Sequence, residues 1–109
     1  MQERILETVL LIPLVRNSDR RPHRPLCWDE LHRAFASFAG GFTRLVDCDT
    51  VDGEWEGVLD RSRRYAIAIP ESRVDTLCDM IRGFLDVFDQ EVFYFTVLGE
   101  VRMITKDAE

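Results

Sequence analysis

The order of apolar and polar residues along the chain predicts strands and helices before any other property is considered. Residues 5–15 are rich in aliphatic and β-branched side chains and predict a first strand. Residues 27–39 place large apolar side chains at helical spacing, which predicts a first helix. Gly40 and Gly41 follow, and we expect them to end this helix because glycine adopts the left-handed conformation at no steric cost.

The second half of the chain repeats this strand and helix pattern. Residues 42–59 alternate and predict a second strand, and residues 63–70 predict a third. Ser72 and Asp75 fit a capping box ahead of one apolar stripe, so we expect a second helix over about residues 72–89.

A fourth strand is predicted over residues 91–98, with a continuation through residues 101–104 after Gly99. The order β-α-β-β-α-β, joined by short loops, predicts an α+β protein with a ferredoxin-like sandwich. In this arrangement the antiparallel sheet has the order 4-1-3-2, and both helices cover one face. We expect residues 1–109 to form a single domain, because the sequence has no repeat, linker or low-complexity segment.

Both faces of the predicted sheet are apolar. A sheet that is open to water on one side alternates apolar and polar side chains, but the first and fourth strands do not. Leu10 and Ile12 point to one side of the first strand and Val9 and Leu11 to the other. This predicts that a second subunit covers the open face, so that the protein is a homodimer. A ligand pocket between subunits is the related option, and a monomer capped by its own C-terminal hairpin is the alternative.

The composition narrows the class of protein. Of the 109 residues 46% are hydrophobic and 31% are charged, as in a globular domain, and the formal net charge is -6. The acidic balance disfavours a nucleic-acid-binding protein, which needs a broad basic face. The apolar runs are shorter than the roughly 20 residues of a membrane helix. Because Glu3, Arg4 and Glu7 interrupt the N-terminal apolar segment, no signal peptide is predicted and we expect a cytoplasmic protein without a membrane partner.

The cysteines and histidines do not predict a metal site or a cofactor. Cys27, Cys48 and Cys78 are odd in number and widely spaced, without the paired Cys/His spacing of a zinc site. His32 lies five residues from Cys27 and off its helical face, which disfavours a cysteine–histidine catalytic pair. Residues 47–53 have some of the acids of a calcium loop, but at the wrong spacing, and fit a solvated hairpin better.

A basic loop follows the first strand in this acidic chain. Residues 16–25 read RNSDRRPHRP, and the predicted topology brings them to one end of the fold with the acidic run 47–60 and residues 86–91. One interpretation is an ion-pair network that holds the loop and relieves acids at the C-terminus of the second helix. The other is an anion site, in which Arg21 or Arg24 binds a phosphate or carboxylate near the N-terminus of the first helix.

Three further residues are candidates for a site. Trp55 lies between two glutamates and is expected to point to the opposite face of its strand, inward. Glu91 begins an apolar strand that also carries Tyr94, and a carboxylate beside aromatic rings can have a raised pKa suited to acid–base chemistry. The alternative for Glu91 is a strand-end residue that pairs with an arginine of the loop.

Residues 38–43 (FAGGFT), 53–55 (GEW) and 88–95 (FDQEVFYF) resemble motifs of a widespread group of small uncharacterised bacterial proteins. That group has an F-G-G-x-T turn, a G-x-W and a late Q-E-x-x-Y/F strand, and its genes often lie on mobile elements or near metabolic genes. The resemblance implies a ferredoxin-like fold and no established activity. It draws attention to four positions, which are Thr43, Trp55, Gln90 and Glu91. The chain departs from the group in its extra Ala39 and its arginine-rich first loop.

The leading hypothesis is a small binding module that dimerises through its sheet and holds a small ligand or a protein partner at the end of the first strand. The candidate ligand-binding residues are Arg21, Arg24, Thr43, Trp55, Gln90, Glu91 and Tyr94. The first alternative is an enzyme of the dimeric α+β barrel type, in which Glu91 and His23 transfer protons on a small anionic or aromatic substrate. The second is an acidic mobile-element effector that presents the 47–60 run to a basic protein surface.

Overall fold

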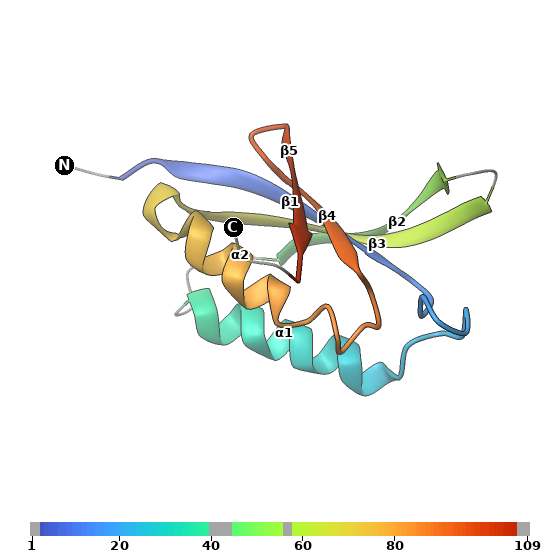
Figure 1. Ribbon diagram of the computed structural model, residues 1–109. Coiled ribbons are helices and arrows are strands. Elements are labelled where there is room, and N and C mark those ends of the chain that lie inside the picture. The colour runs from blue at the N-terminus through green and yellow to red at the C-terminus, as the bar shows by residue number, and fades with distance from the viewer. Residues whose placement is uncertain (1–2, 40–44, 56–57, 107–109) are drawn as a thin grey trace.

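The computed structural model describes residues 3–39, 45–55 and 58–106. Two helices pack on the same side of one antiparallel sheet, so the protein has an α+β fold (Figure 1). The elements in chain order are β1 (Ile5–Pro13), α1 (Pro25–Ala39), β2 (Leu45–Trp55), β3 (Val58–Pro70), the 3-10 turn η1 (Glu71–Arg73), α2 (Val74–Arg82), β4 (Val92–Val97) and β5 (Glu100–Thr105). In the described part of the chain, neither helix is long and apolar enough to cross a membrane.

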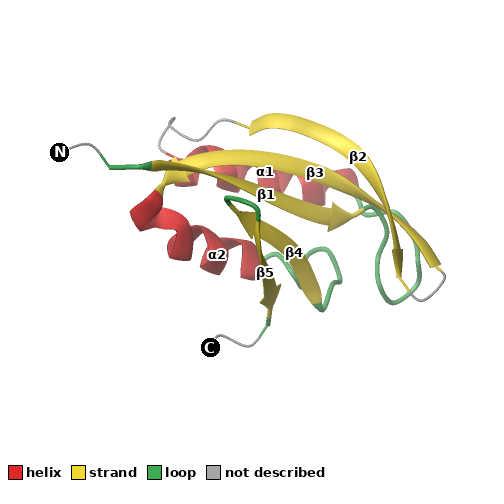
Figure 2. Ribbon diagram, turned by 90° about the horizontal axis from the view of Figure 1, so that it is seen from above, coloured by secondary structure: helices red, strands yellow, loops and turns green. Residues whose placement is uncertain are grey.

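The predicted four-stranded sheet of order 4-1-3-2 is wrong, because the sheet has five strands in the order β2-β3-β1-β4-β5. The expected fourth strand is two strands that pair Val97 with Glu100. Leu98 and Gly99 form the turn between them, with φ of 51° and 83°. Positive φ at both central residues is the geometry of a type I′ hairpin. The fold is therefore β-α-β-β-α-β-β, with β5 at one edge and β2 at the other (Figure 2).

The second helix is shorter than its apolar pattern predicts. It spans Val74–Arg82 rather than residues 72–89, and the capping box is not formed because no side chain caps its N-terminus. The chain continues in turns from Gly83 to Asp89, where Leu85 and Phe88 are fully buried. These two side chains keep the helical spacing of the stripe although their backbone is not helical. Asp86, Asp89 and Glu91 therefore do not lie at the C-terminus of a helix, which corrects the prediction that these acids oppose the dipole of the second helix.

The first helix begins at Pro25, two residues before the predicted start, because proline suits the first helical position. The expected glycine stop at Gly40 and Gly41 lies outside the described residues.

The hydrophobic core lies between the sheet and the two helices. Every second residue of β1 is buried, beginning at Leu6, and the intervening residues face away from the helices. Thr8 is the polar member of the buried row, and its hydroxyl donates to the Ile67 carbonyl at 2.8 Å. The largest fully buried side chains include Tyr65, Phe88, Phe93, Phe95, Leu31 and Ile81.

The other face of the sheet carries apolar side chains that no described segment covers. Tyr94, Val101 and Met103 are 40%, 52% and 55% exposed. The C-terminal hairpin extends the sheet beyond β1 instead of folding over it (Figure 2). The hairpin therefore does not cap this face, and that part of the alternative is wrong.

The hairpin turn generates a stability prediction. Leucine pays a steric cost of about 1–2 kcal/mol in the left-handed region, whereas asparagine visits that region readily. We expect Leu98→Asn to raise the free energy of unfolding by about 0.5–1 kcal/mol, measured by urea denaturation at one fixed protein concentration. Leu98→Ile is the matched control and should lower it, because a β-branched residue tolerates positive φ least. A loss of stability in Leu98→Asn would contradict this account of the turn.

Candidate anion-binding cleft

The loop that joins β1 to α1 folds back on itself. The Arg16 amide donates to the Arg21 carbonyl at 2.7 Å, and the Arg20 amide donates to the Arg16 carbonyl at 3.0 Å. The Arg21 amide donates to the Asp19 carboxylate at 3.0 Å. Arg20 adopts a φ of 60° to complete this turn. These bonds give the arginine-rich segment a defined shape. We call residues 14–24 the arginine loop.

Asp89, just before β4, fixes the arginine loop to the body of the protein. Its carboxylate accepts from the Ser18 amide at 2.8 Å and from the Ser18 hydroxyl at 2.5 Å, and lies 3.9 Å from the Arg16 guanidinium. Its backbone carbonyl accepts from the Asn17 amide at 3.1 Å. The two bonds from Ser18, followed by the charge of Arg16, lower the pKa of Asp89. The ion-pair interpretation of the loop is thus confirmed for Arg16.

Gln90 holds the same loop from its buried side. The side chain is 8% exposed, and its amide donates to the carbonyls of Val15 at 3.0 Å and Phe88 at 2.9 Å. Both N–H groups of the amide are therefore used inside the protein. This bonding gives Gln90 a positioning role at the base of the loop.

His23 forms the inner wall of the arginine loop. Its side chain is buried between the rings of Trp28 and Phe88, with ring centroids 5.5 and 5.0 Å away. The Nε2 atom lies 2.8 Å from the Pro13 carbonyl, and a carbonyl only accepts, so Nε2 carries the proton. Burial, the largest cause, and the charge of Arg16 lower the pKa of His23. The imidazole is therefore neutral at pH 7. Its Nδ1 is buried without a hydrogen-bond partner in the described part of the chain.

A cleft of about 370 Å³ opens beside these residues at the start of α1. It is lined by Arg16, Asp19, Arg21, Pro22, His23, Arg24, Cys27 and Val87. Asp19 pairs with Arg16 at 3.4 Å, whereas Arg21 and Arg24 make no side-chain ion pair with another residue that the structure describes. The positive end of the α1 dipole adds to the charge of these two guanidinium groups. The cleft can therefore attract an anion.

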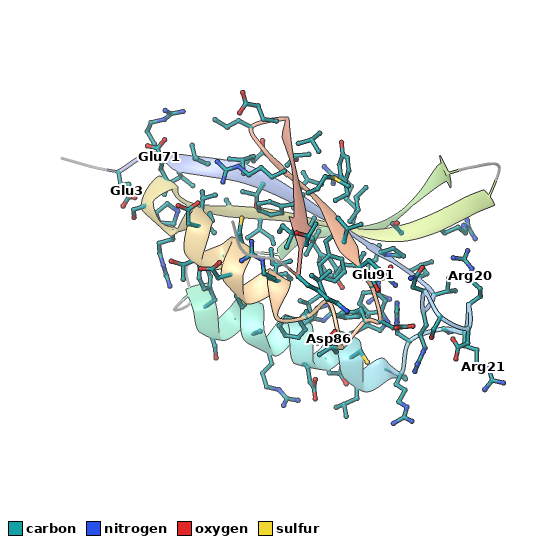
Figure 3. The ribbon with its side chains drawn as sticks, viewed as in Figure 1. Glu3, Arg20, Arg21, Glu71, Asp86 and Glu91 are labelled. Carbon is teal, nitrogen blue, oxygen red and sulfur yellow. The ribbon has the colours of Figure 1, made fainter. Side chains whose placement is uncertain are left out.

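The seven predicted ligand-binding residues do not all lie at this cleft. Arg21 and Arg24 line it, while Gln90 lies behind the loop. Glu91 is exposed at the start of β4, nearer the middle of the molecule than Arg21 (Figure 3), and Tyr94 faces outward from the uncovered side of the sheet.

The remaining two predicted residues fall on parts of the chain that are only partly described. Trp55 ends β2, where its backbone pairs with Val58, but its side chain lies outside the described residues. Thr43 lies wholly outside them.

A second polar cluster lies between α1 and β3, and the sequence did not indicate it. His32 Nε2 lies 2.8 Å from the Tyr65 hydroxyl, and Arg63 donates to the same hydroxyl at 3.5 Å. The Arg63 guanidinium stacks 4.1 Å above the Trp28 ring. Burial, followed by Arg63, lowers the pKa of His32. The sequence did place Trp28 and His32 on one face of the first helix. It could not show that this face meets Arg63 and Tyr65 of β3, because these residues are distant in the sequence.

Comparisons with known proteins show the fold and no family. No family model matches the chain, and no curated protein matches it. Among solved structures, a phage SAM lyase in complex with S-methyl-5'-thioadenosine is similar, with a TM-score of 0.55 and 12% identity over 96% of this chain and 92% of that chain. A phage SAM lyase in the apo state has a TM-score of 0.52 and 12% identity over 100% and 98%. These proteins share the α+β fold of this chain across nearly its whole length.

The two histidines, His23 and His32, generate a pH prediction because the pKa of each is lowered. Their folded-state pKa values lie below 6.5, so the unfolded chain binds more protons than the folded protein as the pH falls below 6.5. The free energy of unfolding should therefore decrease from pH 6.5 downward until the folded-state pKa values are passed. Urea denaturation between pH 7.5 and 4.5 measures this, above the range in which Asp89 loses its charge. His23→Gln should flatten the slope, and a wild-type stability that is constant over this range would contradict the assignment.

The role of Gln90 gives a second prediction for this site. Gln90→Ala leaves the carbonyls of Val15 and Phe88 without this donor, one in a partly buried and one in a buried hydrogen bond, and we expect it to lower the free energy of unfolding by about 1–3 kcal/mol. Glu91→Ala changes the exposed neighbouring residue and should alter it by less than about 0.5 kcal/mol. Thermal and urea denaturation of both variants check this. An unchanged stability in Gln90→Ala would mean that the amide does not hold the loop.

Proposed function

We propose that the protein is a small binding module that associates with itself through its sheet and holds a small anionic ligand in the cleft of the arginine loop. The proposal of an anionic ligand rests on the guanidinium groups of Arg21 and Arg24, which line the cleft. The third arginine of the cleft, Arg16, already pairs with Asp19 and Asp89. Guanidinium groups bind carboxylates and phosphates through two parallel hydrogen bonds. A volume of about 370 Å³ lies within the range of small-molecule sites.

The anchoring of the loop supports this proposal. Gln90 fixes the loop backbone at Val15 and Asp89 fixes it at Ser18, both on the N-terminal side of Arg21 and Arg24, which lowers the cost of ordering the loop when a ligand binds. His23 adds a wall without adding charge, because its pKa is lowered. The anion is held in this proposal by Arg21 and Arg24, with Arg16 and Asp19 forming a neutral rim.

Titration with inorganic phosphate tests the ligand site, with protein amide shifts measured by NMR in a chloride-free buffer. We expect shifts that saturate and that centre on the arginine loop. Arg21→Gln and Arg24→Gln should each weaken binding about 10-fold or more, because each removes a charge-assisted hydrogen bond.

The matched control for this titration is Arg4→Gln. Arg4 is an exposed arginine that pairs with Glu71 at the opposite end of the sheet, the end at which Figure 3 labels Glu3 and Glu71. Its replacement should leave phosphate affinity within about 2-fold of the wild type, since the charge is distant and screened. Equal losses in all three variants would overturn a specific site, as would phosphate shifts that do not involve residues 16–24.

A second candidate function is chemistry on S-adenosylmethionine, and the likeness to two phage SAM lyases favours it. S-adenosylmethionine carries a carboxylate that Arg21 or Arg24 can pair with. Incubation of the protein with this substrate, followed by detection of S-methyl-5'-thioadenosine by mass spectrometry, tests the lyase reaction. S-methyl-5'-thioadenosine itself has no carboxylate, so binding of this compound that survives Arg21→Gln would place the nucleoside outside the arginine cleft.

The proton-transfer enzyme with His23 and Glu91 has less support. The proton of His23 Nε2 is committed to the Pro13 carbonyl, and Glu91 does not line the cleft. The acidic-effector hypothesis depends on side chains of residues 47–60 that lie outside the described set, and it stays a prediction.

A further inference from the structure

The cleft of the arginine loop has a buried hydrogen-bond acceptor in its lining that no described residue uses. His23 lines this cleft and is 7% exposed. Its Nε2 donates to the Pro13 carbonyl, so Nδ1 keeps a free lone pair, and Nδ1 is buried without a hydrogen-bond partner in the described part of the chain. Buried polar atoms are nearly always paired in folded proteins, so an unpaired one requires an explanation. A hydrogen-bond donor on a ligand in the cleft would satisfy this atom.

A carboxylate oxygen is a second acceptor at the cleft. Asp19 also lines it, and the contacts of its carboxylate with the Arg21 amide at 3.0 Å and with the Arg16 guanidinium at 3.4 Å both use Oδ1. The Oδ2 atom takes part in neither contact and can accept from a ligand. The cleft therefore presents a negative charge at Asp19 and a neutral acceptor at His23, in addition to the positive charges of Arg21 and Arg24.

This mixture of charges favours a ligand that carries both signs. A simple carboxylate satisfies the arginines, but it has no donor for the two acceptors. Hydrogen phosphate has one O–H group, but its negative charge is repelled by Asp19. An α-amino acid has a carboxylate and an ammonium group on the same carbon atom. Its carboxylate can pair with Arg21 and Arg24, and its ammonium group has three N–H donors for Asp19 and His23.

The rest of the cleft lining is apolar. Pro22, Cys27 and Val87 complete it, and Val87 is 37% exposed in the absence of a ligand. An apolar side chain that contacts these residues removes apolar surface from water, which favours binding. A volume of about 370 Å³ has room for such a side chain beside the charged groups of an amino acid.

We propose that the cleft binds the zwitterionic head group of an α-amino acid with an apolar side chain. The carboxylate pairs with Arg21 and Arg24, the ammonium group donates to Asp19 and to His23 Nδ1, and the side chain lies against the apolar lining. The inference rests on the anion site of the proposed function and names the class of ligand. A free amino acid and S-adenosylmethionine share this head group, and the experiment below separates these two sources.

Three ligands with the same carbon skeleton test this proposal by NMR titration of the full chain. L-leucine has both charged groups, 4-methylpentanoate has only the carboxylate, and 3-methylbutylamine has only the ammonium group. We expect L-leucine to bind about 10-fold or more tightly than either of the other two, because each of them lacks one set of charge-assisted hydrogen bonds. S-adenosylmethionine is titrated in parallel. Tighter binding of this compound than of L-leucine assigns the head group to the larger molecule, and weaker binding assigns it to a free amino acid.

Variants of the cleft separate the two charged groups of the ligand. Asp19→Asn keeps an oxygen for the Arg21 amide but removes the negative charge, so it should weaken L-leucine about 10-fold without weakening 4-methylpentanoate. Arg21→Gln should weaken both ligands. Glu71→Gln removes an exposed acid at the opposite end of the sheet from Arg21 (Figure 3), and as the matched control it should leave both affinities within about 2-fold of the wild type.

The NMR signal of the His23 Nδ1 nitrogen tests the buried acceptor directly, and its absence from His23→Gln identifies it. L-leucine should shift this signal because the lone pair accepts a hydrogen bond, whereas 4-methylpentanoate should leave it unchanged. Equal affinities for these two ligands, an unchanged preference in Asp19→Asn, or an Nδ1 signal that L-leucine does not move would overturn the inference. Each of these results would leave the anion site intact. Failure of the anion site itself would appear instead as a lack of saturable binding of both phosphate and 4-methylpentanoate.

Discussion

The structure depends on one constraint, which is that two helices can cover only one face of a five-stranded sheet. The central strand β1 is apolar on both of its faces, and the helices bury only the row that contains Leu10 and Ile12. A third layer within the chain would need a further amphipathic element, and the last described element, β5, pairs with β4 in the plane of the sheet. Tyr94, Val101 and Met103 on the second face therefore remain in contact with water in a single copy. Burial of apolar area is the dominant favourable contribution to folding and association, so these side chains are the ones whose burial would gain the most free energy.

The arginine loop shows how an acidic protein keeps a local positive charge. The carboxylates of Asp89 and Asp19 both lie within 4 Å of the Arg16 guanidinium. Such exposed pairs contribute little stability each, but they decide which arginines remain unneutralised. Asp86, the other acid near this region, pairs with Lys106 at 3.0 Å rather than with the loop. The ion-pair and anion-site interpretations of the loop are therefore compatible, since the first accounts for Arg16 and the second concerns Arg21 and Arg24.

The sequence predicted the type of an element where its apolar residues follow a single helical or strand spacing. It predicted the end of an element less well where the following turn continues that spacing. Leu85 and Phe88 continue the spacing of α2 although their backbone forms turns, so the pattern extended the helix too far. The hairpin turn was difficult to recognise in the sequence because Leu98 occupies a position where asparagine is usual. Gly99 is the one residue of the pair that is typical of such a turn. The number of strands, and with it the sheet order, was wrong for this reason.

The candidate site was predictable only in its charges. The density of arginines in residues 16–25 pointed to Arg21 and Arg24 without any knowledge of the fold. His23, in contrast, owes its neutral state to Trp28 and Phe88, which come from two other segments of the chain. Gln90 looked like a ligand residue because it is polar and precedes an apolar strand, whereas its amide bonds to backbone carbonyls. The roles of His23 and Gln90 depend on contacts between segments that are distant in the sequence. The spacing of residues along the chain does not reveal such contacts.

The backbone at the arginine loop is strained in two places, and this bears on whether the loop is more than a connection. Arg20 and Asp89 have φ values of 60° and 52°, and they account for two of the three described non-glycine residues with positive φ. Aspartate tolerates this region, but for arginine it costs roughly 1–2 kcal/mol. A loop that only joined a strand to a helix could place glycine at residue 20 and avoid that cost. Strained residues that persist under tight anchoring occur preferentially at functional sites, and here the anchors are Ser18, Asp89 and Gln90. The strain therefore agrees with a loop whose arginines have to be held in one geometry for a ligand.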